Sequence, residues 1–121
     1  MILMKNSAKL DQLAQEFADC QEVLLAIGDQ TRQSIIITLI SAGCEGMRVG
    51  EITKKTHLSR PAVSHHIKIL KDAKIVSLNR QGTMNYYYLD PTKSTIRLLN
   101  NLTEHIEEYM LDSWDVTNES Q

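Results

Sequence analysis

With 121 residues, 42% of them hydrophobic, and a net charge of −2, the chain suffices for one domain with a modest core but is short for a roomy enzyme pocket. No run of about 18 apolar residues occurs, and the opening "MILMKNSAKL" lacks signal-peptide features, so we expect no membrane association. Two cysteines, Cys20 and Cys44, are too few for a disulfide framework, which favours a cytoplasmic protein.

Helical periodicity dominates the first half of the chain. Residues 8–27 carry apolar side chains at helical spacing and predict a first helix. Asp29 is a candidate N-cap for a second helix, "TRQSIIITLISAG", which Gly43 would end. "RVGEITKKTH" predicts a short third helix. Ser59 would cap a fourth, with Pro61 in its first turn, where a missing N–H costs nothing.

The periodicity then changes to about two residues. "KIVSLNR" and "MNYYYLD" predict a β-hairpin around "QGT", with Gly82 in its turn. A last helix is expected at about 92–112, followed by a frayed tail at 113–121. The predicted fold class is mainly α (α+β). It is a single winged helix-turn-helix domain over 1–121, with five helices and a two-stranded hairpin wing between the recognition helix and the last helix.

Charge is strongly segregated along the chain. Residues 47–97 carry ten Lys/Arg against three Asp/Glu, a net charge of +7, which leaves −9 for the two ends. The positive charge therefore falls on the helix-turn-helix and its wing, whose second helix would enter a DNA major groove. The sequence predicts a DNA-reading core at about 47–90. Unevenly distributed solvated charge is the alternative.

The helix that follows Ser59 holds the candidate base-reading side chains. Arg60 could reach a guanine edge with two hydrogen bonds, or else contact phosphate or lie in solvent. Ser59 can cap the helix and also donate to a phosphate. Ala62 is small enough to touch a thymine methyl group, although it is also simply a good helix former. Ser64 could donate to a phosphate or a base edge.

His65 and His66 are neighbours in this helix, so their side chains diverge by about 100° around the axis. Metal-binding pairs on one helix prefer spacings of three or four, so the two make a poor chelate. Ile67 and Leu70 define the inward face. We therefore expect His65 to contact DNA and His66 to make a structural or phosphate hydrogen bond beside the core.

Further cations flank this helix. They are expected to neutralise phosphates or, individually, to be merely solvated: Lys54, Lys55, Lys68 and Lys71. Arg80 and Gln81 lie at the wing, where arginine commonly reaches a minor groove or its phosphates. The "YYY" of residues 86–88 is expected to serve strand packing rather than base stacking.

Four stretches of the chain resemble the ArsR-type winged helix-turn-helix repressors. They are "LLAIGDQTRQSIIITL", "VGEI", "LSRPAVSHHIKILKDAKIV" and "RQGTMNYYYLD". The resemblance implies a bacterial homodimer that binds an operator and releases it when an effector binds. It implies DNA contacts for the positions at Ser59, Arg60, Ala62, Ser64, His65 and Arg80. Dimerisation helices are expected at about 8–27 and 92–112. Their candidate interface residues, which could instead belong to the protomer's own core, are Leu13, Phe17, Leu99, Leu102, Ile106 and Tyr109.

The metal motifs of that family are missing. "RVGEI" puts Arg48 and Gly50 where its soft-metal sensors have two thiolates, and "DPTKS" offers no histidine at the start of the last helix. His105 and Glu108 keep the spacing of one half of the zinc and cobalt site of that family, without the other half. Cys20 and Cys44 are possible thiol sensors, or simply small residues of the fold.

These observations predict a cytoplasmic, homodimeric repressor that binds an inverted repeat in double-stranded DNA, with no cofactor and an unidentified effector. No catalytic set or phosphate loop is visible, so we do not expect an enzyme. Two alternatives stay open. One is a sensor with an atypical metal or thiol site, and the other is a winged-helix module for protein–protein contact.

Overall fold

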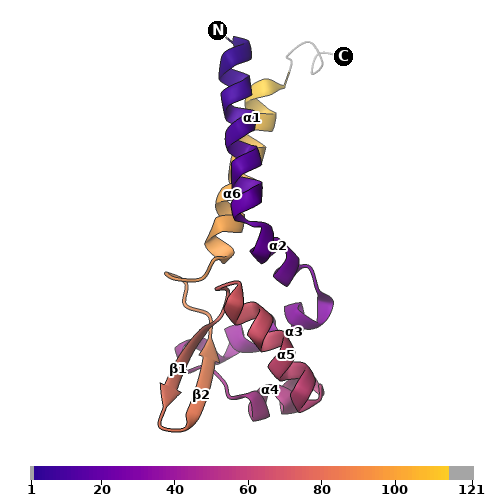
Figure 1. Ribbon diagram of the computed structural model, residues 1–121, viewed down its shortest axis with the longest axis vertical. Helices are drawn as coiled ribbons and strands as arrows, with labels where there is room; N and C mark the ends of the chain where they lie inside the picture. The colour runs from indigo at the N-terminus through magenta and orange to yellow at the C-terminus, as the bar shows by residue number, and fades with distance from the viewer. Residues whose placement is uncertain (1, 115–121) are drawn as a thin grey trace. The chain divides into compact units, whose positions relative to one another are not determined.

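The computed structural model describes residues 2–114, so the tail predicted to fray lies, from residue 115 on, outside the described residues. The chain forms two compact units. We call Glu22–Arg97 the winged-helix unit, and Met1–Gln21 with Leu98–Gln121 the two-helix unit. Within residues 2–114 the elements are, in order, α1 (Ile2–Asp19), α2 (Gln21–Ile27), α3 (Gln30–Ala42), the 3-10 turn η1 (Gly43–Glu45), α4 (Val49–Thr56), α5 (Arg60–Asp72), β1 (Ser77–Gln81), β2 (Met84–Tyr88) and α6 (Ile96–Ser113) (Figure 1).

The single helix predicted over residues 8–27 is wrong, because the structure divides it into α1 and α2 at Cys20. The Cys20 N–H is shared between the carbonyls of Glu16 (3.0 Å) and Phe17 (3.2 Å), the tightened geometry of a last helical turn. Val23 and Ala26 of α2 are then buried, each 2% exposed. The described part of the chain thus has six α-helices rather than the five predicted, and no glycine or proline marks the additional break.

Helices α3, α4 and α5 enclose the core of the winged-helix unit. Ile35 and Leu39 of α3, Ile52 of α4 and Leu70 of α5 are fully buried. The isoleucine-rich segment is helical, as its N-cap predicted, because the Asp29 carboxylate accepts the N–H of Arg32 at 2.9 Å. That hydrogen bond lowers the pKa of Asp29. The predicted stop at Gly43 is also confirmed.

The predicted hairpin is confirmed. Strands β1 and β2 pair antiparallel from Ser77↔Tyr88 to Gln81↔Met84, and Gly82 takes the positive φ of 61° that a two-residue hairpin turn needs. Met47 extends this sheet by one residue, because its N–H and C=O both bond to Tyr87, at 2.9 and 2.8 Å. The wing is thereby joined to the chain segment that leads into α4.

Helix α6 begins at Ile96, four residues later than predicted. Asp90 explains the delay, because its carboxylate accepts the N–H of Thr92 at 2.8 Å and the Thr92 hydroxyl at 2.7 Å, forming a turn. Both bonds lower the pKa of Asp90. The hydroxyl of Ser94 donates to Ile75 O (2.7 Å) and that of Thr95 to Ala73 O (2.8 Å), which fastens this turn to the end of α5.

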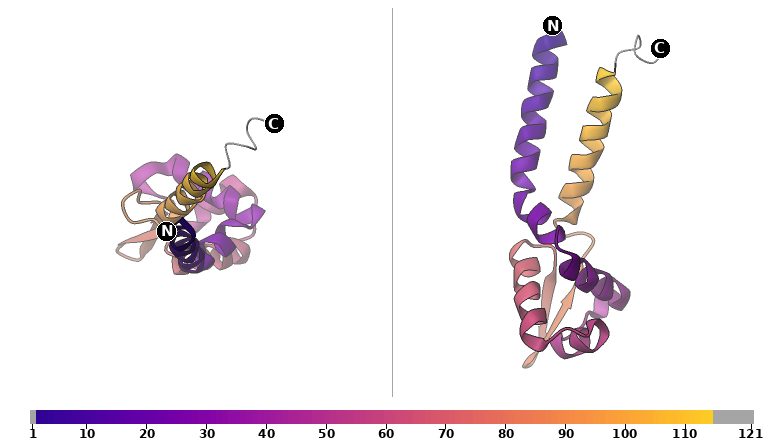
Figure 2. Two further views of the ribbon diagram at one scale, coloured as in Figure 1. Left: turned by 90° about the horizontal axis from the view of Figure 1, so that it is seen from above. Right: turned by 90° about the vertical axis from the view of Figure 1, so that its right-hand side faces the viewer.

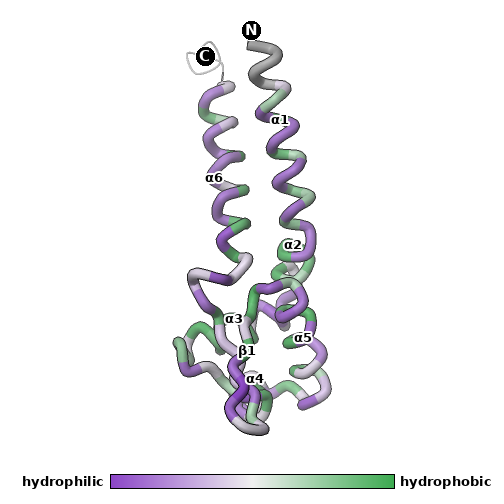
Figure 3. The backbone as a smooth tube through the Cα atoms, turned by 60° about the vertical axis from the view of Figure 1, so that its left-hand side comes forward, coloured by the Kyte–Doolittle hydropathy of each residue, from purple (hydrophilic) through white to green (hydrophobic). Residues whose placement is uncertain are grey.

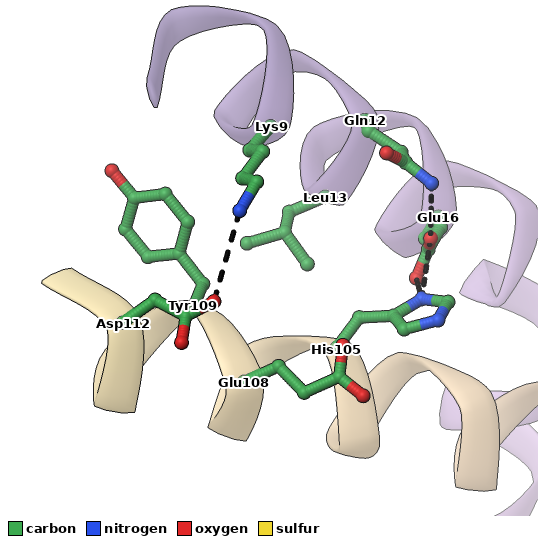
Figure 4. A pocket seen from close by; sticks show the side chains of 8 residues that line it. All are labelled: Lys9, Gln12, Leu13, Glu16, His105, Glu108, Tyr109 and Asp112. Carbon is green, nitrogen blue, oxygen red and sulfur yellow. Dashed lines mark hydrogen bonds and ion pairs between the residues drawn. The ribbon is translucent and has the colours of Figure 1, made fainter. Parts of the chain in front are cut away.

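In the two-helix unit, α1 and α6 run antiparallel, side by side (Figure 2). His105 Nδ1 lies 2.8 and 2.9 Å from the carboxylate oxygens of Glu16, and Lys9 lies 3.7 Å from Asp112 (Figure 4). These side chains line a pocket of about 190 Å³ between the helices. The Glu16–His105 contact raises the pKa of His105.

The two-helix unit leaves apolar side chains in solvent. Leu10 and Phe17 of α1 are 49% and 46% exposed, and Met110 of α6 is 61% exposed. Hydrophobic positions recur along both helices between hydrophilic ones (Figure 3). Leu102, in contrast, is 2% exposed within the protomer itself.

Among the described residues, no single helix has the length and apolar character needed to cross a membrane. The α2–α3 region meets these criteria only as a pair bent by 91°, on length and composition alone.

Candidate nucleic-acid interface

The turn between α4 and α5 is short and sharply defined. Helix α4 ends at Thr56, and His57 adopts a left-handed conformation with φ 60° and ψ 21°. Ser59 then begins α5, since its Oγ accepts the N–H of Ala62 at 3.2 Å, as the sequence predicted. Pro61 occupies the first turn of α5. The helix-turn-helix is therefore held by local hydrogen bonds as well as by the core beneath it.

Helix α5 has one face in the core and one in solvent. Val63, Ile67 and Leu70 are at most 2% exposed, which fixes the rotation of the helix about its axis. Ser64 and His65 lie on the exposed side, and Ala62 is half-buried. Of the candidate base-reading residues, Ala62 therefore offers the least free surface.

Arg60 is exposed and lies close to α4 in this structure. A Cβ built on Gly50 would approach Arg60 Nη1 to 3.3 Å, so the absence of a side chain at Gly50 leaves room for the guanidinium. The sequence had linked Gly50 only to the missing metal motif. Its position next to Arg60 could not be inferred from spacing along the chain.

The candidate phosphate contacts differ in their present partners. Lys54 and Lys55 are exposed in the last turn of α4. Lys68 is exposed too, but its Nζ pairs with Asp72 at 2.7 Å, one helical turn away. A phosphate contact by Lys68 would therefore compete with an existing ion pair, although an exposed pair of this kind stabilises a protein by only about 0.3–0.5 kcal/mol.

At the wing, Arg80 and Gln81 are exposed beside the hairpin turn, and Arg80 Nε donates to Gly82 O at 3.4 Å. Tyr86, Tyr87 and Tyr88 are each half-buried, and the backbone of Tyr87 holds Met47. This placement agrees with the strand-packing role that was predicted for the three tyrosines.

His66 is half-buried and has the structural hydrogen bond that its position suggested. Its Nδ1 lies 3.2 Å from Nη1 of Arg32, a residue of α3. Arg32 was not among the functional candidates. The two residues are 34 positions apart, so no local pattern could have revealed their contact.

Comparison with known proteins agrees with this geometry. The family described as "Bacterial regulatory protein, arsR family" matches residues 29–77, which include the helix-turn-helix. Over 90 residues the chain is 36% identical to an HTH-type transcriptional regulator of Methanocaldococcus jannaschii, which covers 73% of this chain and 99% of that protein. This chain belongs to the ArsR family.

Two further similarities concern a curated repressor and a solved structure. The transcriptional repressor SdpR of Bacillus subtilis is 40% identical over 70 residues, which cover 58% of this chain and 74% of SdpR. The crystal structure of an ArsR family transcriptional regulator, RHA00566, superposes with a TM-score of 0.66 at 19% identity, covering 81% of this chain and 95% of that one. The latter likeness establishes the winged-helix fold. This ArsR-family chain is therefore a winged helix-turn-helix transcriptional regulator.

Among the sensor candidates of this ArsR-family chain, the two cysteines differ in exposure. No group of three or more His, Cys, Asp or Glu side chains in the described residues could hold a metal ion. His105 already faces Glu16. Burial raises the pKa of the Cys20 thiol, which disfavours the reactive thiolate, and Cys44 is exposed.

Proposed function

We propose that this ArsR-family regulator is a homodimeric, cytoplasmic repressor that binds an inverted-repeat operator in double-stranded DNA. The observation that carries the proposal is the rotation of α5. Its core residues turn Arg60, Ser64 and His65 outward together, on the part of the chain that has a net charge of +7. In a helix-turn-helix, the N-terminal residues of the second helix meet the base edges.

Different residues are given different tasks in this proposal. Arg60, Ala62, Ser64 and His65 read bases, while Ser59 and the cations Lys54, Lys55 and Lys68 hold phosphates. Arg80 and Gln81 of the wing contact the neighbouring groove or its backbone. Repression, rather than activation, is favoured by the likeness to SdpR, whose name states that it is a transcriptional repressor.

Fluorescence anisotropy with a labelled duplex from the regulator's own upstream region tests DNA binding. We expect binding that weakens steeply as salt rises, because each phosphate contact releases counterions. Absence of binding at low salt would refute the proposal. Salt-independent capture of a protein partner would instead support the protein–protein alternative.

Two variants separate base reading from phosphate binding. Arg60→Ala should lose about 1–3 kcal/mol of discrimination between the operator and a base-substituted duplex. Lys54→Gln, an exposed cation on α4, should weaken binding to both duplexes alike and reduce the salt slope by about one. Equal effects of both variants on discrimination would remove Arg60 from the base-reading set.

We propose that two protomers meet through α1 and α6. Support comes from exposed apolar side chains that recur at seven-residue spacing, Leu10 with Phe17 on α1, and from half-buried Leu99 with Ile106 on α6. Leu13 and Tyr109 are half-buried on the same helices and are assigned to the edge of the interface. Leu102 has almost no surface left for a partner, so we assign it to the protomer's own core.

The effector is proposed to be something other than a metal held by the motifs known in the family. His105 and Glu108 remain the candidates for an atypical site, but the engagement of His105 with Glu16 means that a metal would first have to break that contact. Titration with zinc and cadmium, with DNA release as the readout, distinguishes the sensor alternative. Release of DNA at a stoichiometric amount of metal would favour the metal-sensor alternative.

A further inference from the structure

Arg32 makes an unusually complete set of contacts for a side chain near the start of a helix. Its Nε donates to Ala26 O at 2.7 Å and its Nη2 to Leu25 O at 3.2 Å. Both carbonyls belong to the last turn of α2, where backbone oxygens lack intrahelical partners. The remaining arm, Nη1, lies 3.2 Å from His66 Nδ1 on α5. One guanidinium therefore joins the end of α2 to the middle of the helix proposed to read DNA.

The contact with Arg32 constrains the orientation of the His66 ring. A guanidinium has only donors, so a hydrogen bond between the two side chains requires Nδ1 of His66 to accept it. Asp29, the N-cap of α3, accepts the backbone N–H of Arg32 at 2.9 Å, and its carboxylate also interacts electrostatically with the charge of Arg32. The charged and titratable groups close to the His66 ring include Arg32, Asp29 and His65.

The ring of His66 in turn packs against the ring of His65. The two centroids are 5.3 Å apart and the planes meet at 62°, an edge-to-face arrangement that aromatic rings favour. His65 is exposed on the outer side of α5, whereas His66 is half-buried. A fixed inner ring therefore restricts the orientations open to the outer one.

We propose that Arg32 is a positioning residue for DNA recognition, acting through the His66 ring to hold His65 in its base-reading orientation. This inference rests on the proposed function, since it requires that His65 contact DNA. Without Arg32, the His66 ring is free to turn, and His65 must be ordered at the moment of binding. That ordering cost falls on the specific complex, in which His65 adopts one orientation, and not on non-specific binding through phosphates.

Binding of an operator duplex and of a scrambled duplex of equal length tests the inference. We expect Arg32→Gln to lower the ratio of the two affinities by about five- to tenfold, a typical coupling for residues in one network, while affinity for the scrambled duplex changes little. His66→Phe, which keeps a ring beside His65 but removes the acceptor, should give a similar loss. It leaves the two bonds from Arg32 to α2 in place and so covers the case in which Arg32→Gln fails to fold.

Gln33 provides a matched control, because its Nε2 donates to Ile27 O at 2.9 Å, at the same end of α2, without reaching His66. Gln33→Ala should leave the affinity ratio unchanged. An equal loss in Gln33→Ala would show that Arg32 merely stabilises α2, and it would overturn the inference.

A double-mutant cycle with His65→Ala decides the route of the effect. If Arg32 acts through His65, adding Arg32→Gln to His65→Ala should change the affinity ratio by less than about twofold. Additive losses would overturn the inference while leaving the proposed function intact. A wild-type protein that does not prefer the operator would refute the proposed function itself. A His65→Ala variant with wild-type preference would show that His65 reads no base; it would overturn the inference and remove His65 from the base-reading set, while operator binding itself would stand.

Discussion

At the scale of single residues, Gly46 leaves the least room for a side chain. It has a φ of 73°, and a Cβ built there would lie 2.5 Å from Tyr87 O, where the wing meets Met47. We expect Gly46→Ala to lower the free energy of unfolding by more than about 3 kcal/mol, because the strain of a conformation that favours glycine adds to the displacement of a strand backbone. Gly43→Ala is the control. It has a φ of 64°, a ψ of −147° and open space, so backbone strain alone should cost about 1–3 kcal/mol. If urea unfolding showed equal losses of unfolding free energy for the two variants, the clash with Tyr87 would contribute nothing.

Lys74 is strained for the opposite reason, since it is a residue with a Cβ at a position that favours glycine. Its φ is 61°, and it closes α5 with a Schellman motif in which Ile75 N–H bonds to Leu70 O at 3.0 Å. Lys74→Gly should raise the free energy of unfolding by about 1 kcal/mol. Lys74→Ala keeps the Cβ and removes the charge, so it should be nearly neutral. A gain in both variants would attribute the effect to charge rather than to backbone strain.

The residues that sequence could predict are those whose partners lie within a few positions. The caps at Asp29 and Ser59 and the turn at Gly82 each depend on local chemistry, and all three were predicted. The link from Arg32 to His66 depends instead on how α3 packs against α5. For the same reason, sequence could place His66 on the inner side of its helix but could not name its partner.

At the scale of elements, the α1–α6 pair is joined by a contact that responds to pH. The hydrogen bond with Glu16 raises the pKa of His105 above its usual 6.5, assisted by the charges of Glu16, Glu108 and Glu104. A raised histidine pKa stabilises the folded state fully below the unfolded-state value. The stabilisation is lost as pH rises through the folded-state value. The difference in stability between wild type and His105→Gln should therefore be largest below about pH 6.5 and shrink at higher pH.

Thermal unfolding followed by circular dichroism from pH 5.5 to 9 measures that difference. His65→Gln is the matched control, because His65 is exposed and forms no ion pair within residues 2–114. The difference between His65→Gln and wild type gives the background against which the pH dependence of His105→Gln is judged. If the effect of His105→Gln were independent of pH, the contact with Glu16 would contribute nothing as a charged pair.

Element boundaries also mark where sequence prediction failed. The helical periodicity of residues 8–27 is real, but the side chains of α1 and α2 belong to different units, so one continuous pattern covers two helices. Near the other end of the chain, Thr92 donates two hydrogen bonds to the Asp90 carboxylate and forms a turn, so α6 begins only at Ile96. Both errors arise because tertiary context and turn chemistry override helical spacing.

At the scale of the whole molecule, positive and negative charge are divided unevenly along the chain. The positive charge lies mainly in residues 47–97, which belong to the winged-helix unit, while the ends of the chain have a net charge of −9. This division was visible in the sequence because composition requires no knowledge of packing. The sequence did not reveal which apolar side chains of the two long helices are exposed. Leu102 is buried, for example, whereas Met110 on the same helix is exposed.

The proposed dimer predicts that a charge on the exposed apolar side of α1 should separate the protomers. Phe17→Glu should convert a dimer into a monomer in sedimentation-velocity experiments. It should also weaken operator binding by about 100-fold or more, because a single winged helix loses the second half-site. Ala8→Glu adds the same charge nine residues away, about 180° around the helix, and should leave the dimer intact. The isolated fold should persist in both variants, as judged by far-ultraviolet circular dichroism. A Phe17→Glu protein that remains dimeric would place the interface elsewhere, whereas dissociation by both variants would point to a general effect of negative charge on α1.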